Sequence, residues 1–451
     1  MSNNQQYSYI SLLLLHGGIG GLVFLFPFLT KVYSFSVFCF GIYYLLKTQN
    51  KNNEALVLSA YVVGAEVLFR MTDGMFFNEY AKYSIMIFLF IGMIYTGFSK
   101  NSYLYWLFLI LLVPGIVLST ITLDFGTNIR KAIAFNISGP VCLGVAAIYC
   151  YHRNISLDRL KQVLSASCFS LISILLYLYL YTPSVKDVVT NTQSNFATSG
   201  GFGPNQMATV LGLGIFVFFV QLLLNSPTIA LKLINGALTL LFAFRGLVTF
   251  SRGGIFTGII MIVLLLIVVY FELSIKGRSK IVVIVIVSVL SSLGVWRYSS
   301  QQTGGLIDKR YANEDSRGRK KASQLTGREV LIESEFQMFL DNPFLGIGVG
   351  KNKEYRAEQS GIESASHNEL TRMLAEHGLL GFMALLILLL TPLVLYFIHR
   401  ENIFALSFLV FWLLTINHAA MRIAAPAFIY ALSLLKVYHI EKTVVHREQI
   451  V

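Results

Sequence analysis

Residues 253–272 read GGIFTGIIMIVLLLIVVYFE, and this stretch decides the class of the fold. About 20 apolar residues in a helix cross the roughly 30 Å of hydrocarbon in a bilayer, because each residue advances the helix by about 1.5 Å. The only charged residue in the stretch is Glu272, at its very end. The stretch therefore predicts a transmembrane helix.

The same apolar composition extends along the whole chain. Of its 451 residues, 55% are hydrophobic and 13% are charged, and the mean hydropathy is +0.66. Soluble globular proteins have about 25% charged residues, so the composition excludes an ordinary cytoplasmic enzyme. It also excludes a disordered chain. A disulfide scaffold is excluded too, because all four cysteines lie inside apolar runs: Cys39, Cys142, Cys150 and Cys168.

Apolar segments of similar length recur from one end of the chain to the other. We therefore expect an all-α fold, a polytopic integral membrane bundle of about 12–14 transmembrane helices. The first segment lacks the basic start and cleavage site of a signal peptide, so we expect it to be retained. The fourteen candidate spans are 8–29, 32–47, 54–70, 81–98, 103–121, 132–151, 160–181, 204–224, 228–249, 253–272, 280–298, 378–398, 403–419 and 424–440.

The basic residues of the short loops predict the orientation in the membrane. With both termini in the cytoplasm, twelve Lys and Arg residues lie in inner loops and six in outer loops, which obeys the positive-inside rule. Topology therefore explains the net charge of +12, and we expect no nucleic-acid partner. The chain divides into residues 1–298 with eleven spans, a large external loop at 299–377, and residues 378–451 with the last spans and a cytoplasmic tail.

Two parts of the external loop have distinct compositions. The first, 301–324, is polar and strongly basic, and we expect it to be mobile; its basic residues are Lys309, Arg310, Arg317, Arg319, Lys320 and Lys321. The second, 326–340, has apolar residues at helical spacing and predicts an amphipathic helix with Thr326 as its N-cap.

A further helix is expected at the end of this loop. Residues 366–369 have the S-x-x-E form of a capping box, so we expect a helix that begins there and ends at Gly378. His367 would lie in its first turn, where the helix dipole disfavours a second positive charge. The imidazole should therefore stay neutral, which a general base requires.

Arginines at the outer ends of spans need an ion-pair partner or a functional role. Inserting an arginine at the centre of a membrane helix costs about 2.5–3.5 kcal/mol on insertion scales. Guanidinium groups bind phosphate oxygens through two parallel hydrogen bonds, so binding a concentrated anion is one such role. The arginines concerned are Arg70, Arg130, Arg245, Arg252, Arg297 and Arg422.

The alternative is that these arginines extend to the interface or form internal ion pairs. We expect this of Arg70, because Glu66 lies four residues earlier on the same helical face. Arg252 is the stronger candidate for anion binding. It is flanked by Ser251 and by two glycines, which allow an anion to approach closely.

Several residues of the loop could take part in acid–base chemistry or bind hydroxyl groups. His367, His377, Glu369 and Glu376 compete for the role of base, whereas Asn205, Gln206 and Asn368 could hydrogen-bond to sugars. The sequence has no D-x-D motif, no Walker glycine loop, no H-E-x-x-H and no His/Cys cluster with metal spacing. We therefore expect no metal and no cofactor.

These motifs, taken together and in order, resemble the bacterial O-antigen ligase and polymerase superfamily. The set is Gly203-Pro-Asn-Gln206, Ser251-Arg-Gly-Gly254, Gly327-Arg328, Asp341 to Gly350 and Ser366-His-Asn368. His367-Asn368, followed by nine residues and then Gly378-Leu-Leu-Gly381, resembles the ligase signature of that family. The likeness covers roughly residues 203–381.

The resemblance implies a metal-independent glycosyltransferase of the GT-C type in the bacterial inner membrane. Such an enzyme moves a glycan from undecaprenyl diphosphate to an acceptor hydroxyl at the periplasmic face, where the large loop would lie. The acceptor could be another lipid-linked repeat, the lipid A core or a protein, so polymerase, ligase and protein oligosaccharyltransferase all stay open. Further expected partners are membrane lipids and a chain-length regulator.

Carried over residue by residue, the resemblance makes His367 the catalytic histidine. Arg252 and Arg328 match the arginines that hold the diphosphate, and Arg245, Arg130 or Arg422 would assist them. Asn205, Asn368 and Glu376 are expected to bind the glycan or the acceptor. The alternative function is a transporter or flippase of anionic lipid-linked sugars, which would use discontinuous helices and a charged path near the bilayer midplane.

Overall fold

The computed structural model describes residues 3–77, 79–321, 323, 328–361, 364, 366–418 and 421–439. The expected N-cap Thr326, the motif residue Gly327 and the tail from residue 440 lie outside these ranges. The helices are α1 (Asn3–Leu25), α2 (Leu29–Thr48), α3 (Glu54–Met71), α4 (Tyr80–Thr96), α5 (Tyr103–Thr122), α6 (Ile129–Cys150), α7 (Leu157–Tyr181), α8 (Pro204–Leu224), α9 (Ile229–Leu247), α10 (Arg252–Glu272), α11 (Ile275–Gln302), α12 (Leu306–Tyr311), α13 (Arg328–Asp341), α14 (Asn352–Ser360), α15 (Glu369–Ile398), α16 (Ala405–Thr415) and α17 (Ala425–Leu432), with 3-10 turns η1 (Lys100–Ser102) and η2 (Ala197–Ser199) and strands β1 (Asn154–Ser156) and β2 (Lys436–Tyr438).

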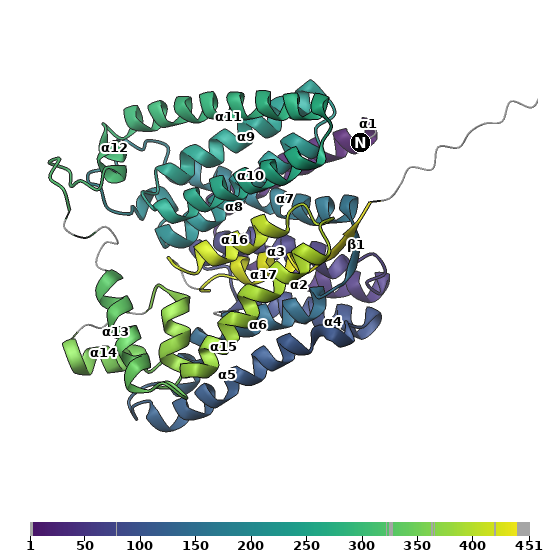
Figure 1. Cartoon of the computed structure of the whole chain (residues 1–451). Helices are drawn as coiled ribbons and strands as arrows, with labels where there is room; N and C mark the ends of the chain where they lie inside the picture. The colour runs from purple at the N-terminus through teal and green to yellow at the C-terminus, as the bar shows by residue number, and fades with distance from the viewer. Residues whose placement is uncertain are drawn as a thin grey trace, which may run out of the picture.

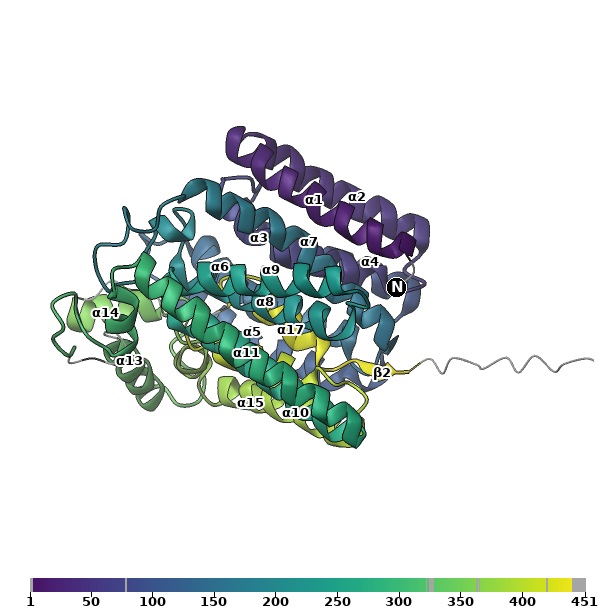
Figure 2. The same ribbon diagram turned by 90° about the horizontal axis from the view of Figure 1, so that it is seen from above.

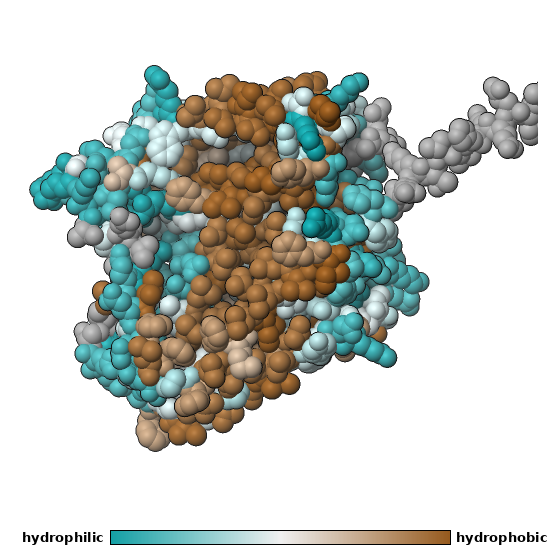
Figure 3. Space-filling view, in the orientation of Figure 1, coloured by the Kyte–Doolittle hydropathy of each residue, from teal (hydrophilic) through white to brown (hydrophobic). Residues whose placement is uncertain are grey.

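The long helices form one bundle (Figure 1). Seen from above, α1 and α2 form an outer layer on one side, and α10, α11 and α15 lie on the opposite side (Figure 2). The surface carries a hydrophobic belt across the middle, with hydrophilic side chains gathered at both ends (Figure 3). This is the pattern of a bundle that crosses a bilayer.

Ten helices in the described part of the chain are long and apolar enough to cross a membrane: α1, α2, α5 together with η1, α6, α7, α8, α9, α10, α11 and α15. The expected all-α polytopic membrane fold is therefore confirmed. The described strands are two three-residue segments that pair in parallel, with Ile155 opposite Val437.

Each of the fourteen expected spans coincides with a helix, but four of these helices are shorter or more polar than a full span. The helices α4 and α16 are apolar but short, and α3 carries Glu54, Glu66 and Arg70. The eight residues of α17 are all buried. Because α17 is surrounded by protein instead of lipid, its length does not have to match the hydrocarbon thickness.

The two ends of the bundle have different contents. The start of α1 and strand β2 lie at one end, and α12, α13 and α14 lie at the other (Figure 1). Both described ends of the chain thus lie opposite the large loop, as the sequence predicts; which end faces the cytoplasm stays a prediction.

The segment that was expected to be mobile has a defined structure in its described residues. Helix α11 continues to Gln302, α12 follows, and an antiparallel bridge joins Glu314 to Lys320. Acidic side chains explain the difference, because they accept hydrogen bonds within the segment. Asp308 accepts from Trp296 Nε1 at 2.8 Å, and Asp315 Oδ1 accepts from two backbone N–H groups at 2.9 Å.

Helices α8 and α10 cross at very close range near the centre of the bundle. A Cβ atom added to Gly212 would overlap the carbonyl oxygen of Gly254, and one added to Gly254 would overlap the backbone at Ala208. Small residues at such crossings let helix backbones approach in membranes. This contact fixes the position of the first turn of α10, which begins with Arg252.

We predict that Gly212→Ala lowers the stability of the protein by about 1–3 kcal/mol, because the added methyl group must push two backbones apart. Gly236→Ala is the matched control, since a Cβ there meets no heavy atom within 4 Å. Thermal unfolding in detergent, followed by tryptophan fluorescence, measures both variants. Equal unfolding temperatures for the two would contradict the close crossing.

Candidate active site

A cluster of cations lies where α10, α12 and α13 meet at the loop end of the bundle. Arg252 begins α10 and Arg328 begins α13, and both are partly buried. Arg310 in α12 is buried, and its Nε donates to the Phe250 carbonyl at 3.0 Å. Lys321 Nζ donates to Thr192 Oγ1 at 2.8 Å. The cluster therefore combines two residues that the motifs predict with two that they do not.

The electrostatics of this cluster favour a bound anion. Burial, together with Arg252 and Arg328, lowers the pKa of Arg310 to about 10. Burial and Arg252 also lower the pKa of Arg328, and burial, Arg310 and Arg252 lower the pKa of Lys321. Each like charge disfavours the charged form of its neighbour, and a bound anion would reverse this effect. Glu329 offsets Arg328 in part, so positive charge remains in excess.

Polar groups next to Arg252 hold its helix against α8. Ser251 Oγ donates to Asn205 Oδ1 at 2.8 Å, and Asn205 Nδ2 donates to the His418 carbonyl at 3.3 Å. Gly253 is required here, because a Cβ would lie 2.7 Å from the His418 ring. Asn205, expected to bind the glycan, thus has both ends of its amide engaged within the protein.

His367 lies just before α15 and is half-buried. The structure corrects the expected capping box: the N-cap is Asn368, whose Oδ1 accepts from Leu370 N at 2.9 Å, and the helix begins at Glu369. His367 is therefore outside the first helical turn. The backbone is extended at Asn368, so its short amide reaches the free N–H groups before Ser366 can.

Arg422 stands beside the His367 segment. Its Nη2 donates to the carbonyl of Ser366 at 2.7 Å, and its guanidinium lies 5.8 Å from the centre of the Phe135 ring. Burial and the nearby Arg372 lower the pKa of Arg422. The structure thus brings one expected helper arginine to the candidate base.

A buried ionic network lies directly below this segment. Arg372 binds Glu369 on one side and Glu376 on the other, with Nη1 of Arg372 and Oε2 of Glu376 2.6 Å apart. The other oxygen of Glu376 accepts from Gly350 N at 2.8 Å. Glu376, expected to bind the acceptor, therefore has both oxygens engaged in holding the glycine-rich turn of 346–350 to α15.

Burial separates the four candidates for the base. Glu369, Glu376 and His377 are at most 1% exposed, whereas His367 is half-buried. The ring of His377 packs against Gly115 and has no hydrogen-bond partner among the described residues. His367 is therefore the candidate that a substrate can reach. Past His377, the expected helix end at Gly378 appears as a break inside α15, where φ is 60°.

The other expected arginines lie apart from the cation cluster. Arg245 is buried and donates to the carbonyls of Leu178 at 2.7 Å and Thr182 at 3.3 Å, so it caps the end of α7. Arg130 is exposed in the first turn of α6. The expected pair of Arg70 and Glu66 is confirmed, with a nitrogen–oxygen distance of 2.9 Å.

The turn after α16, described at residues 416–418 and 421–424, contacts both groups of side chains. Glu369 N donates to the Ile416 carbonyl at 2.9 Å, and Ala424 N donates to Glu66 Oε2 at 2.7 Å. His418, in the same turn, packs on Gly253 next to Arg252. Arg252 and His367 therefore flank this turn at the same end of the bundle.

A lipid-facing groove of about 600 Å³ lies between α9 and α11. Its lining is mostly apolar, and Phe244 at its edge belongs to a buried cluster with Phe250 and Ile307. Arg310 binds the carbonyl of Phe250, so this hydrophobic cluster lies between the groove and the cation cluster. The lining residues are Tyr179, Ala237, Leu240, Leu241, Phe244, Ser291, Gly294, Val295 and Tyr298.

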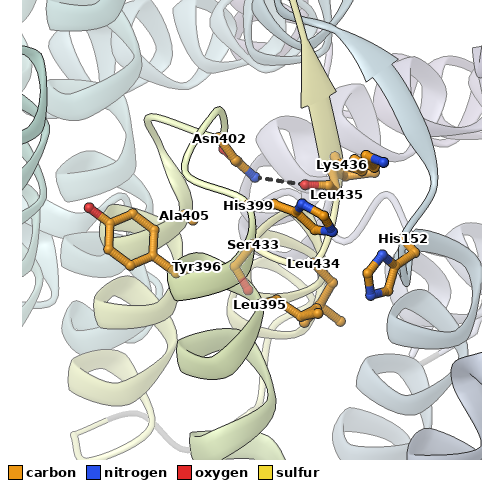
Figure 4. Close-up of a pocket in the computed structure, with 10 residues that line it drawn as sticks. All are labelled: His152, Leu395, Tyr396, His399, Asn402, Ala405, Ser433, Leu434, Leu435 and Lys436. Atoms are coloured by element: carbon orange, nitrogen blue, oxygen red, sulfur yellow. Dashed lines mark hydrogen bonds between the residues drawn. The ribbon is translucent and has the colours of Figure 1, made fainter. Parts of the chain in front are cut away.

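A second pocket lies at the opposite end of the bundle, beside strand β2 (Figure 4). His152, His399 and Lys436 are among the residues around it. Its volume of about 10 Å³ fits one water molecule. This pocket is therefore too small for a glycan or a lipid.

Sequence reasoning missed Arg310, Lys321, His418 and Arg372. A signal was present for Arg372, because the spacing Glu369, Arg372, Glu376 places all three on one helical face. Arg310 and Lys321 carried no such signal, since only the fold of the loop brings them to α10.

Residues 237–386, about a third of the chain, match the family model described as O-antigen ligase. This region of the chain is similar to the O-antigen ligase family. No curated protein matches the chain. The matched region contains the whole cation cluster, His367 and Arg372, and the match supports a membrane protein that ligates or polymerises glycans. Lipid-linked glycans and their acceptors are the general substrates that this family implies.

We predict that Arg372→Met destabilises the protein by about 3–5 kcal/mol, because it leaves two buried carboxylates without their cation. The triple variant Arg372→Met, Glu369→Gln, Glu376→Gln should recover part of this loss. Thermal unfolding in detergent gives the comparison. If the single and triple variants unfold at the same temperature, the network does not carry the stability assigned to it.

Proposed function

We propose that this protein is a metal-independent glycosyltransferase that moves a glycan from undecaprenyl diphosphate to an acceptor hydroxyl. One observation carries the proposal: within the region similar to O-antigen ligases, a cluster of cations and a reachable histidine flank the same turn. The reaction would take place at the periplasmic face of the bacterial inner membrane, with both termini in the cytoplasm.

The diphosphate would bind to Arg252, Arg328 and the newly found Arg310. Guanidinium groups suit this role because they stay charged and bind phosphate oxygens in pairs. Gly253 and Gly254, which follow Arg252, pack against His418 and the backbone of α8, so they fix the position of this arginine. As the bond between the anomeric carbon and the diphosphate breaks, negative charge grows on the leaving oxygen, and these arginines would stabilise it.

His367 would act as the general base. The acceptor oxygen attacks the anomeric carbon, its proton passes to the imidazole of His367, and undecaprenyl diphosphate leaves. Arg422 binds the carbonyl of Ser366 and so fixes the backbone next to this histidine. Asn368 would contribute by holding the same segment at the start of α15, with its remaining amide group directed to the acceptor.

The groove between α9 and α11 offers a path for the prenyl chain. It faces lipid, has a mostly apolar lining and is connected to Arg310 through Phe244 and Phe250. A volume of about 600 Å³ lies within the usual range of about 300–1,000 Å³ for ligand sites. A lipid-linked donor could therefore enter sideways, with its chain in the groove and its diphosphate at the cations.

We predict that Gly294→Phe raises KM for a donor with a long prenyl chain by about tenfold while the protein stays folded. A Cβ at Gly294 meets no heavy atom within 4 Å, so the ring can occupy the groove without a clash. Gly18→Phe, at an equally open position on α1, is the matched control. Steady-state kinetics with long-chain and short-chain donors give the test, and an unchanged KM for the long-chain donor would reject the path.

His367→Ala should lower the rate of glycan transfer by about 10²–10⁴-fold, the usual contribution of a general base, with donor binding retained. The purified protein is incubated with one lipid-linked repeat unit, without and with candidate acceptors, and product length is read on gels. A fully active variant would remove His367 from the mechanism. Arg252→Lys is the contrasting control, since it keeps the charge but loses the planar fork and should weaken donor binding.

The same assay distinguishes the transporter or flippase alternative, because a flippase changes the side of the membrane and makes no new glycosidic bond. The internal ion pairs of the described residues favour the enzyme, since Glu66, Arg70, Glu369 and Arg372 bind one another instead of lining a path. The arms with and without acceptor separate a polymerase from a ligase or a protein oligosaccharyltransferase.

A further inference from the structure

A basic hairpin, residues 309–321, extends from the cation cluster away from the hydrophobic belt. It forms part of the hydrophilic projection beside α12 at the left of Figures 1 and 3. Six of its residues are basic and two are acidic. The positive-inside rule applies to short loops, and the loop at 299–377 is long, so membrane topology does not explain this excess.

The cations form a continuous series from the interior to the surface. Arg310 is buried at the cluster, Lys321 is half-buried next to it, and Arg317 and Lys320 are exposed at the tip. Burial and the positive charges of Arg310 and Arg252 lower the pKa of Lys321. The base of the hairpin therefore lies within the electrostatic field of the proposed diphosphate site.

The acidic residue Asp315 neutralises one cation of the series, Arg319, and otherwise holds the hairpin together. Asp315 accepts from the backbone N–H groups of Arg317 and Arg319 and pairs with the Arg319 guanidinium at 2.8 Å. Lys309 Nζ donates to the Ser316 carbonyl at 2.8 Å. Among the described residues, Arg317 and Lys320 have no ion pair, so their charges face outward.

The hairpin is also held in place. Thr192 Oγ1 donates to the Glu314 carbonyl at 2.9 Å, and Lys321 binds the same threonine, so the hairpin rests on the 182–203 loop. A fixed basic surface loses little conformational entropy when a ligand binds. This favours a binding role over a freely solvated run of charges.

We propose that the donor glycan is anionic, with carboxylate-bearing sugars, and that the basic hairpin binds them. The inference rests on the proposed function: a glycan whose diphosphate lies at Arg252 and Arg328 must extend away from the membrane, and the hairpin follows that direction. Carboxylates spaced along an oligosaccharide match cations spaced along the hairpin. A neutral glycan would leave this surface unused.

Anionic phospholipid headgroups are the competing occupant, because basic residues near a membrane also attract them. They would lie at the level of the headgroups, however, and not along a projection that leaves the belt. The experiment below therefore includes them as a separate arm.

The test uses the full-length protein in phosphatidylcholine nanodiscs. The probes are an oligogalacturonate, which carries a carboxylate on each sugar, and a neutral maltooligosaccharide of equal length. Binding is measured for the wild type, for Arg317→Gln with Lys320→Gln, and for the matched control Lys276→Gln with Lys280→Gln. The control removes two exposed charges at the opposite end of the bundle. A last arm replaces part of the phosphatidylcholine with phosphatidylglycerol.

We expect the wild type to prefer the oligogalacturonate, and the hairpin variant to lose about tenfold in affinity, since each exposed charge contributes about two- to fivefold. The control variant should bind as the wild type does, and high salt should abolish the preference. No preference in the wild type, an equal loss in the control, or complete competition by phosphatidylglycerol would overturn the proposal. Binding needs no turnover, so a protein that binds the probe but transfers no glycan would contradict only the proposed function.

Discussion

The structure depends on one constraint, namely that buried charges must find partners. Glu66 and Glu369 are buried at the loop end of the bundle, and each accepts a backbone hydrogen bond from the turn described at residues 421–424. Arg70 and Arg372 neutralise these carboxylates and bind further backbone carbonyls. Because an unpaired buried charge costs several kcal/mol, the turn has one stable position. That position sets the distance between the first turn of α10 and the start of α15, and hence between the cations and His367.

The cation cluster brings like charges together. Its cations lie close enough to repel one another, and Glu329 offsets their charge only in part. These cations are Arg252, Arg310, Lys321 and Arg328. The repulsion between the cations persists in the folded protein. An anion that binds here would relieve it. A site of this kind binds phosphate groups without a metal, because the protein has already brought the positive charges together. The neighbouring groove would bring a lipid anchor to the same point.

Much of this arrangement was predictable from the sequence, and the remainder depended on tertiary contacts. Apolar runs predicted every long helix, and local motifs predicted that Arg252, Arg328 and His367 lie at one end. Sequence patterns could not show that Arg310 and Lys321 return to α10, because that contact joins segments about 60 residues apart. Nor could they show that Asn205 and Glu376 form hydrogen bonds within the protein, since the same polar residues could equally face a substrate. The N-cap at Asn368 was missed because two capping residues lay within one short motif.

The burial of α17 has a consequence for biosynthesis. This short helix is buried along its whole length, yet it follows all the other described helices in the chain. The helices α6 and α16 that pack against it are therefore synthesised first, and the space between them is filled only after α17 has been made. Strand β2 then pairs with β1. A chain truncated just before this helix would lack the side chains that fill the space between α6 and α16.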